Sequence, residues 1–241
     1  DLHPRVRRQR QMCIRDRREL IDALHRAGKK IILVNCSGSP IGLEPETQKC
    51  EAILQAWYPG QQGGKAVAEV LFGDYNPAGK LPVTFYRNVS QLPDFEDYNM
   101  TGRTYRYMQD VPLFPFGYGL SYTTFGYGKT VLDKNELTAG QSLKLTVPVT
   151  NTGKRNGEEV VQVYLRKQGD AEGPIKTLRA FKRVSIPAGK TVNVEFDLKD
   201  KELEWWDDQS NTVRVCPGNY DIMVGGSSKE EDLQRTTIAI K

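Results

Sequence analysis

The hydrophobic pattern of the first third of the chain predicts alternating helices and strands. Residues Arg18–Ala27 have helical spacing, and the apolar run Ile31–Asn35 is typical of a strand buried on both faces of a parallel sheet. Ala52–Trp57 predicts a second strand, and Gly63–Phe72 predicts a helix that ends at Gly73. This order favours an α/β architecture, although about 60 residues are too few to complete a doubly wound sheet.

The next segment, Asp74–Thr124, changes character and is dense in Pro, Gly, Tyr and Phe. A disordered chain has little use for so many aromatic side chains. We therefore interpret the segment as a long ordered connector whose aromatic residues hold it against a folded surface.

From about Gly126 the pattern becomes that of β-structure. Apolar residues alternate with polar ones along Ser142–Gly153, and further short strands are predicted at Val160–Leu165, Arg179–Ile186, Thr191–Leu198, Asn219–Val224 and Thr236–Ile240. Roughly seven such strands indicate an antiparallel β-sandwich of the immunoglobulin or fibronectin III type. Because no cysteine pair is placed to bridge the sheets, the fibronectin III-like variant is favoured.

These patterns divide the chain into four parts. Residues 1–18 are predicted to be a non-native or disordered tail, 19–87 a truncated α/β sandwich domain, 88–125 the aromatic-rich connector and 126–241 the fibronectin III-like β-sandwich. We expect the β-sandwich to fold independently and the α/β part to expose apolar surface.

The positive charge of the chain is concentrated in its first eighteen residues. The whole chain has 34 Lys and Arg against 30 Asp and Glu, whereas residues 1–18 alone carry seven Arg and two Asp. The string MCIRDR at Met12–Arg17 resembles translated sequencing-adapter sequence, and a basic nucleic-acid arm is the alternative. The remaining 27 basic and 28 acidic residues give no reason to expect nucleic acid or an anionic membrane as a partner. No apolar run approaches the ~18 residues of a transmembrane helix.

The cysteine and histidine content argues against several kinds of site. The four Cys (13, 36, 50 and 216) form no C-x-x-C pair, and only His3 and His25 are present. A zinc site and a Ser-His-Asp or Cys-His centre are therefore hard to build. We expect His25 on a helix surface and Cys36 as a small buried side chain, and leave a Cys36–Cys50 disulfide open.

Three stretches together resemble the family 3 glycoside hydrolases. They are ILQAWYPGQQGGKAVAEVLFGDYNPAGKLPVTF (Ile53–Phe85), GRTYRYM (Gly102–Met108) and PLFPFGYGLSYTTF (Pro112–Phe125). LRAFKRVSIPAGKTVNVEFDL and PGNYDIMVGGSS are similar to the fibronectin III-like domain of that family. The resemblance covers nearly everything from Arg18 to Lys241.

The resemblance implies a retaining exo-β-glycosidase that acts on β-glucosides or β-xylosides without a cofactor or a metal. Members of the family carry an N-terminal (β/α)8 barrel, an α/β sandwich domain and then the fibronectin III-like domain. An Asp of the barrel is the nucleophile and a Glu, usually from the second domain, is the acid/base. A retaining mechanism needs two carboxyl groups about 5 Å apart.

This sequence departs from the family pattern because it holds no barrel. The position of the usual acid/base falls in the region of the adapter-like tail. We therefore assign no catalytic residue and expect the chain alone to be inactive.

Two groups of acidic residues could be considered in place of the missing catalytic carboxyl groups. Glu44 and Glu46 follow the first predicted strand, where sites are common, but Pro45 and Glu46 also suit the solvated first turn of a helix. Asp94, Glu96 and Asp97 are expected to form a solvated loop.

Arg103 and Arg106 are the weak candidates for binding substrate. Each could reach a sugar or a carboxylate, or could instead hold the connector by hydrogen bonds.

The aromatic residues and one glycine pair also have two interpretations. Trp57 and Tyr58 are expected to pack at a domain interface rather than stack on sugar, and Trp205 and Trp206 to belong to the sandwich rather than form a carbohydrate platform. Gly63-Gly64 could bind an anion at a helix N-terminus, although tight packing explains it as well.

Two functions of different classes remain. The first is the C-terminal part of a β-glycosidase with an oligo- or disaccharide substrate, in the periplasm or outside the cell. The second is a standalone carbohydrate-binding or interaction module. The sugar, the linkage and the oligomeric state stay open.

Overall fold

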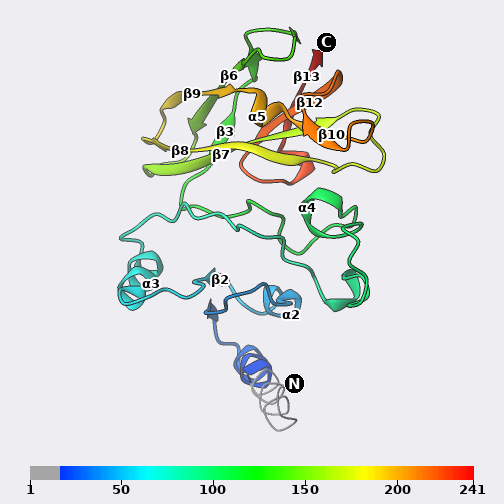
Figure 1. Ribbon diagram of the computed structural model, residues 1–241. Helices are drawn as coiled ribbons and strands as arrows, with labels where there is room; N and C mark the ends of the chain where they lie inside the picture. The colour runs from blue at the N-terminus through cyan, green and yellow to red at the C-terminus, as the bar shows by residue number, and fades with distance from the viewer. Residues whose placement is uncertain (1–16) are drawn as a thin grey trace.

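The computed structural model describes residues 17–241, so the tail predicted at residues 1–18 lies almost wholly outside the described residues. Figure 1 shows the N-terminal elements at one end of the molecule and the β-sandwich at the other, with residues 74–124 running between them. The molecule therefore has two unequal parts joined by a long irregular segment.

The N-terminal part is a small α/β unit. Residues 17–26 are helical, and β1 (Ile32–Asn35), α2 (Glu44–Thr47), β2 (Ala52–Gln55) and α3 (Gly63–Phe72) follow. β1 and β2 pair in parallel, as predicted. Gly73 ends α3 with φ of 81°, a left-handed conformation that glycine adopts without strain, and donates its N–H to the Val70 carbonyl.

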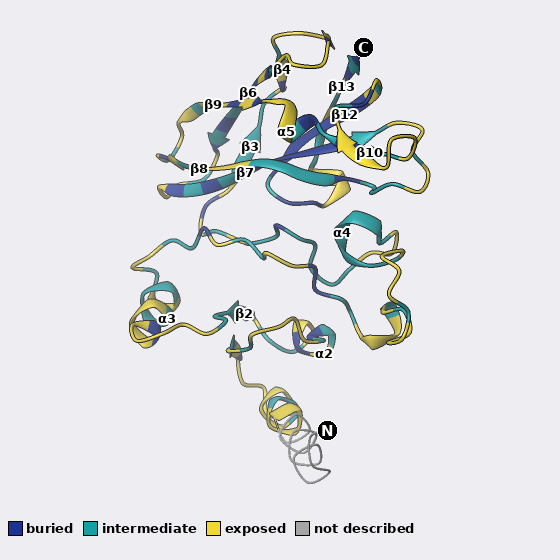
Figure 2. Ribbon diagram, viewed as in Figure 1, coloured by how far each residue is buried: buried dark blue, intermediate teal, exposed yellow. Residues whose placement is uncertain are grey.

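The prediction that the first strand is buried on both faces is wrong. Ile31 is buried, but Ile32 is 53% exposed. Within residues 17–241 this sheet has only two strands, so no neighbouring layer covers the side to which Ile32 points. Figure 2 shows the same contrast at a larger scale, because dark blue residues concentrate in the sandwich and yellow ones in the N-terminal part.

The connector is held together by its aromatic side chains, as predicted. It contains η1 (Val89–Gln91) and α4 (Thr104–Tyr107). Phe85 and Phe114 form a short antiparallel bridge, and their rings meet edge to face at 6.2 Å. Tyr105 stacks on Phe116 at 4.3 Å and contacts Tyr164 of the sandwich at 5.9 Å. These contacts attach the connector to the sheet surface.

Two sheets form the sandwich from Phe125 onward. One has the order β5-β13-β12-β7-β8, and the other has β3-β6-β4 with β9 also paired to β6. The strands are β3 (Phe125–Tyr127), β4 (Val131–Leu132), β5 (Glu136–Leu137), β6 (Leu143–Asn151), β7 (Gly157–Lys167), β8 (Thr177–Ile186), β9 (Thr191–Leu198), β12 (Gly218–Gly225) and β13 (Gln234–Ile240).

The remaining elements lie at the edges of the sandwich. They are α5 (Asp200–Leu203), the antiparallel hairpin of β10 (Trp205–Asp207) and β11 (Thr212–Arg214), and η2 (Glu230–Asp232). The sandwich architecture is confirmed, although the two main sheets hold nine strands rather than roughly seven. β3, β4 and β5 have two or three residues each, too few for an alternating pattern to reveal.

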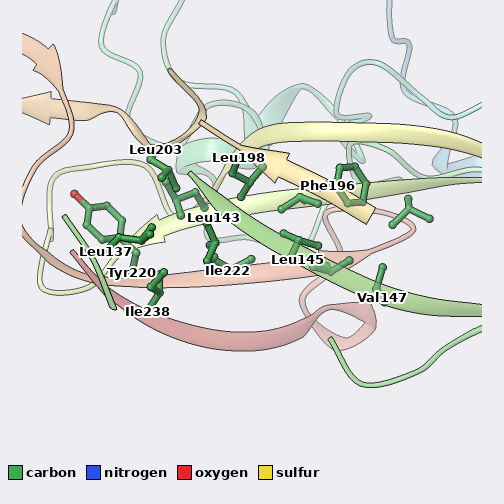
Figure 3. Packing of buried hydrophobic residues seen from close by; sticks show 14 of the residues in the cluster. Leu137, Leu143, Leu145, Val147, Phe196, Leu198, Leu203, Tyr220, Ile222 and Ile238 are labelled. Atoms are coloured by element: carbon green, nitrogen blue, oxygen red, sulfur yellow. The ribbon is translucent and has the colours of Figure 1, made fainter. Parts of the chain in front are cut away.

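The core of the sandwich follows directly from the alternation along β6. Leu143, Leu145, Val147 and Val149 are at most 1% exposed, while the residues between them lie on the opposite face of the sheet and are exposed or half-buried. Figure 3 shows this row meeting Leu198 of β9 and Ile222 of β12. Burying one such side chain stabilises the fold by roughly 1.5–3 kcal/mol.

Tyr220 holds in place the segment that leads into β12. The Tyr220 hydroxyl donates a hydrogen bond of 2.9 Å to the Cys216 carbonyl, four residues earlier. Its ring meets Trp205 edge to face at 6.1 Å, and the Trp205 indole N–H donates to Asp170 Oδ2 at 2.6 Å. A buried tyrosine that bonds back to the chain before its strand is a recurrent feature of such sandwiches.

Candidate functional site

A groove of about 700 Å³ opens at the carboxyl end of β1. It is lined by residues 35–37, the loop and first turn at 40–46, connector residues 86–89 and 92, Leu33, and Arg17, Arg18 and Ile21 of the first helix. Ligands of open α/β sheets bind outside the carboxyl ends of the strands, and the volume suits a small molecule. This groove is the candidate functional site.

Glu46 is the most buried acidic residue of the groove. It is 5% exposed, although the sequence predicted a solvated position, because α2 turns this side chain toward the first helix rather than outward. Arg18 Nε lies 3.0 Å from Glu46 Oε1, and Arg18 Nη2 donates to the Gly42 carbonyl at 2.8 Å. Glu46 Oε2 is buried without a hydrogen-bond partner.

Glu44 is engaged in a different way. Its Oε1 lies 3.2 Å from Arg87 Nη1, and Arg87 Nε donates to the Val111 carbonyl. Glu44 therefore ties α2 to the connector. Because each carboxylate is already paired with a guanidinium group, the two glutamates act as scaffold, and neither is presented as a free acid or base.

Amide side chains close the groove at the ends of the two strands. Asn35 Nδ2 donates to Gln55 Oε1 at 2.5 Å and to Ser37 Oγ at 2.9 Å, and Gln55 Nε2 donates to the Ser37 carbonyl at 3.2 Å. These bonds hold the loop after β1 against the end of β2. Of these three residues, Asn35 and Ser37 line the groove with polar side chains.

The acidic cluster of the connector is an organised loop. Asp94 Oδ1 accepts from the Glu96 N–H and Asp97 Oδ1 from the Asn99 N–H. Arg103 donates to the carbonyls of Asp94, Asp97 and Asn99. Arg103 thus holds its own loop by hydrogen bonds, which is the second of the two roles considered for it.

Arg106 is turned toward the sandwich, away from this loop. Its guanidinium lies over the Tyr107 ring at 5.6 Å, and its Nε is buried without a partner. Its carbonyl accepts the Ile175 N–H at 2.6 Å. The structure does not bring Arg103 or Arg106 into the groove lining.

The predicted interface aromatics separate into two kinds. Trp57 adopts φ of 52° and packs edge to face on Phe85 at 6.1 Å. Tyr58 is 80% exposed among the described residues because the chain turns outward at Pro59-Gly60, beyond the end of β2, and its packing at a domain interface stays a prediction.

The tandem tryptophans differ in the same way. Trp205 is 2% exposed and belongs to the sandwich core, whereas Trp206 is 48% exposed on the hairpin. Adjacent strand residues point to opposite faces, so only one of the two can be buried here. At Gly63, a Cβ would come within 2.6 Å of the Pro59 ring, which supports tight packing as the reason for this glycine.

Of the described cysteines only Cys36 lines the groove, and His25 does not line it. Cys36, Cys50 and Cys216 are free, so the disulfide that was left open is not formed. Cys36 is exposed rather than buried, because it follows the end of β1 instead of lying within it. His25 lies on the helix surface, as predicted. Within residues 17–241 no three His, Cys, Asp or Glu side chains gather as a metal site.

A buried ionic cluster joins the connector to the sandwich, and the sequence did not reveal it. Lys80 Nζ lies 3.1 Å from Glu159 Oε1, which also accepts from the Tyr127 hydroxyl at 3.0 Å. Burial raises the pKa of Glu159, and the contacts with Lys80 and Tyr127 oppose that rise. Burial and the neighbouring Glu159 also raise the pKa of Tyr127. Glu159 is 4% exposed and lies one position before the strand predicted at Val160–Leu165, so the predicted pattern did not include it.

Comparison with known protein families covers both parts of the molecule. The family model of the glycosyl hydrolase family 3 C-terminal domain matches residues 8–122, and that of a fibronectin type III-like domain matches residues 159–228. The chain belongs to glycosyl hydrolase family 3.

Individual relatives within family 3 agree with this assignment. A xylan 1,4-β-xylosidase of Xylanibacter ruminicola is 56% identical over 223 residues, which cover 92% of this chain and 26% of that protein. A periplasmic β-glucosidase of Salmonella typhimurium is 39% identical over 224 residues, 88% of this chain and 29% of that protein. The chain thus spans about a quarter to a third of the length of the curated relatives it matches.

Solved structures show the same partial coverage. A β-glucosidase from Erythrobacter marinus superposes with a TM-score of 0.81 at 41% identity, over 92% of this chain and 30% of that one. A β-glucosidase from Listeria innocua, solved in complex with glucose, gives 0.79 at 29% identity, over 92% and 32%. In the described part of this family 3 chain, no helix is long and apolar enough to cross a membrane.

Proposed function

We propose that this chain is the C-terminal portion of a retaining exo-β-glycosidase that hydrolyses terminal β-D-xylosides or β-D-glucosides. The observation that carries the proposal is the 56% identity to a xylan 1,4-β-xylosidase across both parts of the chain. Because β-glucosidases are also among the relatives, the proposal includes both xylosides and glucosides as substrates. A periplasmic or extracellular location is proposed with it, supported by the similarity to the periplasmic β-glucosidase of Salmonella typhimurium.

In this proposal the chain contributes a wall of the substrate site rather than the reacting groups. The groove offers amide and hydroxyl groups of Asn35 and Ser37 beside apolar side chains such as Leu43, a combination that suits a pyranose ring. Retaining hydrolysis needs a free carboxylate nucleophile and a second carboxyl group about 5 Å away. Glu44 and Glu46 are both held by arginines, so the chain by itself is proposed to be inactive.

The deciding experiment is hydrolysis of aryl β-xyloside and aryl β-glucoside by the purified 241-residue chain. We expect no turnover above the buffer rate. The control is a second preparation carrying Glu44→Gln and Glu46→Gln. Turnover by the unmodified chain that disappears in this variant would show that the chain carries its own carboxylate pair, and the inactivity proposal would then fail.

The alternative is a standalone carbohydrate-binding or interaction module built on the sandwich. Exposed Trp206 is the observation that favours it, since an exposed indole ring can stack on a sugar face. Calorimetric titration with xylohexaose separates the two proposals. Saturable binding that is lost in Trp206→Ala but kept in the control Phe181→Ala supports the module.

A further inference from the structure

A short segment of the connector, residues 84–86, lies between the groove and α4. Tyr86 is half-buried and lines the groove, whereas Thr84 is 5% exposed. The Tyr86 hydroxyl accepts the N–H of Thr104 at 2.8 Å, and Thr84 Oγ1 accepts the N–H of Tyr105 at 3.1 Å. The same segment therefore contributes to the wall of the groove and donates no backbone group to α4, but holds its first two N–H groups by side-chain oxygens.

These two bonds replace the side-chain cap that α4 lacks. The first N–H groups of a helix have no partner within the helix, and a side chain at the N-cap usually accepts from one of them. Arg103 occupies the N-cap of α4 and makes no such bond, because a guanidinium group has donors only. The start of α4 consequently depends on two hydroxyl groups that lie 18 and 21 positions away in the chain.

The turn that these bonds hold is strained. Thr104 adopts φ of 56°, a left-handed conformation that is rare for a β-branched residue. Such a conformation costs free energy and persists only where neighbouring contacts enforce it, which is common at ligand clamps and switch regions. The Tyr86 hydroxyl bonds to the strained residue itself. The turn should therefore respond when the Tyr86 side chain gains or loses freedom of motion.

The strained turn is also connected to the sandwich through α4. The Tyr105 hydroxyl accepts the N–H of Leu178 at 3.1 Å, and the Arg106 carbonyl accepts the N–H of Ile175 at 2.6 Å. Leu178 belongs to β8, and Ile175 lies two positions before that strand. A continuous set of contacts thus leads from the groove through Tyr86 and α4 to the start of β8.

We propose that Tyr86 couples occupancy of the groove to the strained turn at the start of α4. A ligand that fills the groove packs against the Tyr86 side chain and restricts its motion, so the hydroxyl stays bonded to the Thr104 N–H for a larger fraction of the time. Bound ligand therefore stabilises the turn, and the formed turn favours binding in return. The ligand is a neutral pyranoside, and in this respect the inference rests on the proposed function.

Hydrogen exchange of the Thr104 amide, followed by NMR on the 241-residue chain, measures this coupling directly. The probes are methyl β-D-xyloside and methyl β-D-glucoside, and the amide signals of Asn35 and Ser37 report binding in the groove. We expect the signals of Asn35 and Ser37 to shift and saturate. At saturation the probe should slow exchange at Thr104 about fivefold or more.

The two ways in which this measurement can fail are distinguishable. Saturable shifts at Asn35 and Ser37 without slower exchange at Thr104 would overturn the coupling and leave the glycosidase proposal intact. The absence of a saturable shift at both residues, with either probe, would overturn the coupling together with the role of the groove in binding sugar.

Two matched variants separate coupling from a purely structural role of Tyr86. Tyr86→Phe keeps the ring and removes the acceptor, so exchange at Thr104 should become about fivefold faster and the probe should no longer slow it. Thr84→Val removes the neighbouring acceptor, but Thr84 does not line the groove. In that variant exchange at Tyr105 should become faster, whereas the probe should still slow exchange at Thr104.

The comparison of the two variants also gives the result that would contradict the proposal. If the probe slowed exchange at Thr104 equally in Tyr86→Phe and in the unmodified chain, Tyr86 would hold the turn without responding to the ligand, and the coupling would be overturned. The measurement on the unmodified chain decides the question by itself if Tyr86→Phe does not fold.

Discussion

The β-sandwich and the N-terminal α/β part bury their apolar residues very differently. Of the strongly buried hydrophobic residues within residues 17–241, twenty-two lie after Thr124, two in residues 74–124 and two in residues 17–73. Of the exposed large hydrophobic residues, seven lie in residues 17–73, ten in residues 74–124 and four after Thr124. The sandwich closes a core of its own, whereas the α/β part presents apolar surface that its own elements do not cover.

This contrast separates two ways in which a segment becomes ordered. The strands of the sandwich are stabilised by one another through a shared core. Residues 74–124 have regular structure only in η1, α4 and the Phe85–Phe114 bridge, and depend also on individual contacts with the sandwich, such as Tyr105 on Tyr164. The irregular segment is therefore only as stable as the surface beneath it.

Limited proteolysis should show the largest difference in stability between the sandwich and the rest of the chain. Phe95 and Tyr98 are 92% and 90% exposed in a loop, whereas Phe181 is 68% exposed but belongs to β8. Chymotrypsin should cleave after Phe95 or Tyr98 about a hundredfold faster or more than after Phe181, since a strand must open before it is cut. Mass spectrometry of the early fragments measures this. Equal early cleavage at Phe181 would show that the sandwich is no more stable than the loop.

The same digestion tests where the stable unit begins. The sequence predicts a sandwich that folds independently from about Gly126. Asn76 and Lys80 bond to Asn156 and Glu159, so we expect the resistant core to retain residues 74–87 as well. Loss of that segment from the core would favour the boundary predicted from sequence.

A substitution in the shared core should have the next largest effect. Leu145→Ala removes a side chain that is 1% exposed in the sandwich, and should lower the free energy of unfolding by roughly 2–5 kcal/mol. The matched control is Leu120→Ala, where the leucine is 73% exposed and the expected change is below about 0.5 kcal/mol. Urea denaturation measures both. Similar losses in the two variants would contradict the contrast between the regions.

The smallest effect should come from the ionic cluster that joins the regions. Lys80→Met leaves Glu159 buried without its cation and should destabilise the chain by about 2 kcal/mol, less than for a fully buried pair because Lys80 keeps some contact with solvent. Lys80→Met with Glu159→Gln removes both charges and should recover much of the loss.

The pH dependence of that variant has a defined sign. Burial raises the pKa of Glu159 above its value in the unfolded chain, and removing Lys80 takes away its largest opposing influence. The native state then binds more protons than the unfolded state just above pH 4.5, so stability falls as pH rises through the folded pKa. Lys80→Met should therefore lose more stability at pH 8 than at pH 5, and a loss that does not change with pH would contradict this assignment.

Repeating patterns explain which parts of the fold could be predicted. The alternation in β6 and the helical spacing in α3 extend over eight or more residues, so their bounds were predicted closely. The two-residue strands β4 and β5 carry no such signal. The burial of Glu46 and the exposure of Tyr58 depend on which elements lie beside them in the folded chain. The residues adjacent in sequence do not predict these tertiary neighbours.

The candidate site was harder to predict for the same reason. Glu44, Glu46, Arg103 and Arg106 were all singled out by type and position. The arginine partners of the two glutamates lie in distant segments, whereas Arg103 bonds within its own loop. Arg18 reaches Glu46 across 28 positions, and Lys80 reaches Glu159 across 79. Local patterns indicate which residues could act, whereas the contacts that decide their roles arise only when the chain has folded.

The attachment of the connector to the sandwich also sets an order of events during synthesis. Translation runs from the N-terminus, so the aromatic residues of the connector leave the ribosome before the strands that receive them. The carbonyl of Phe116 accepts the N–H of Ser228, a residue that is synthesised 112 positions later. Throughout that interval Tyr105 and Phe116 have no sheet on which to pack. The nascent chain thus carries exposed aromatic surface until β12 and β13 emerge, a stage at which chaperones would bind it most strongly.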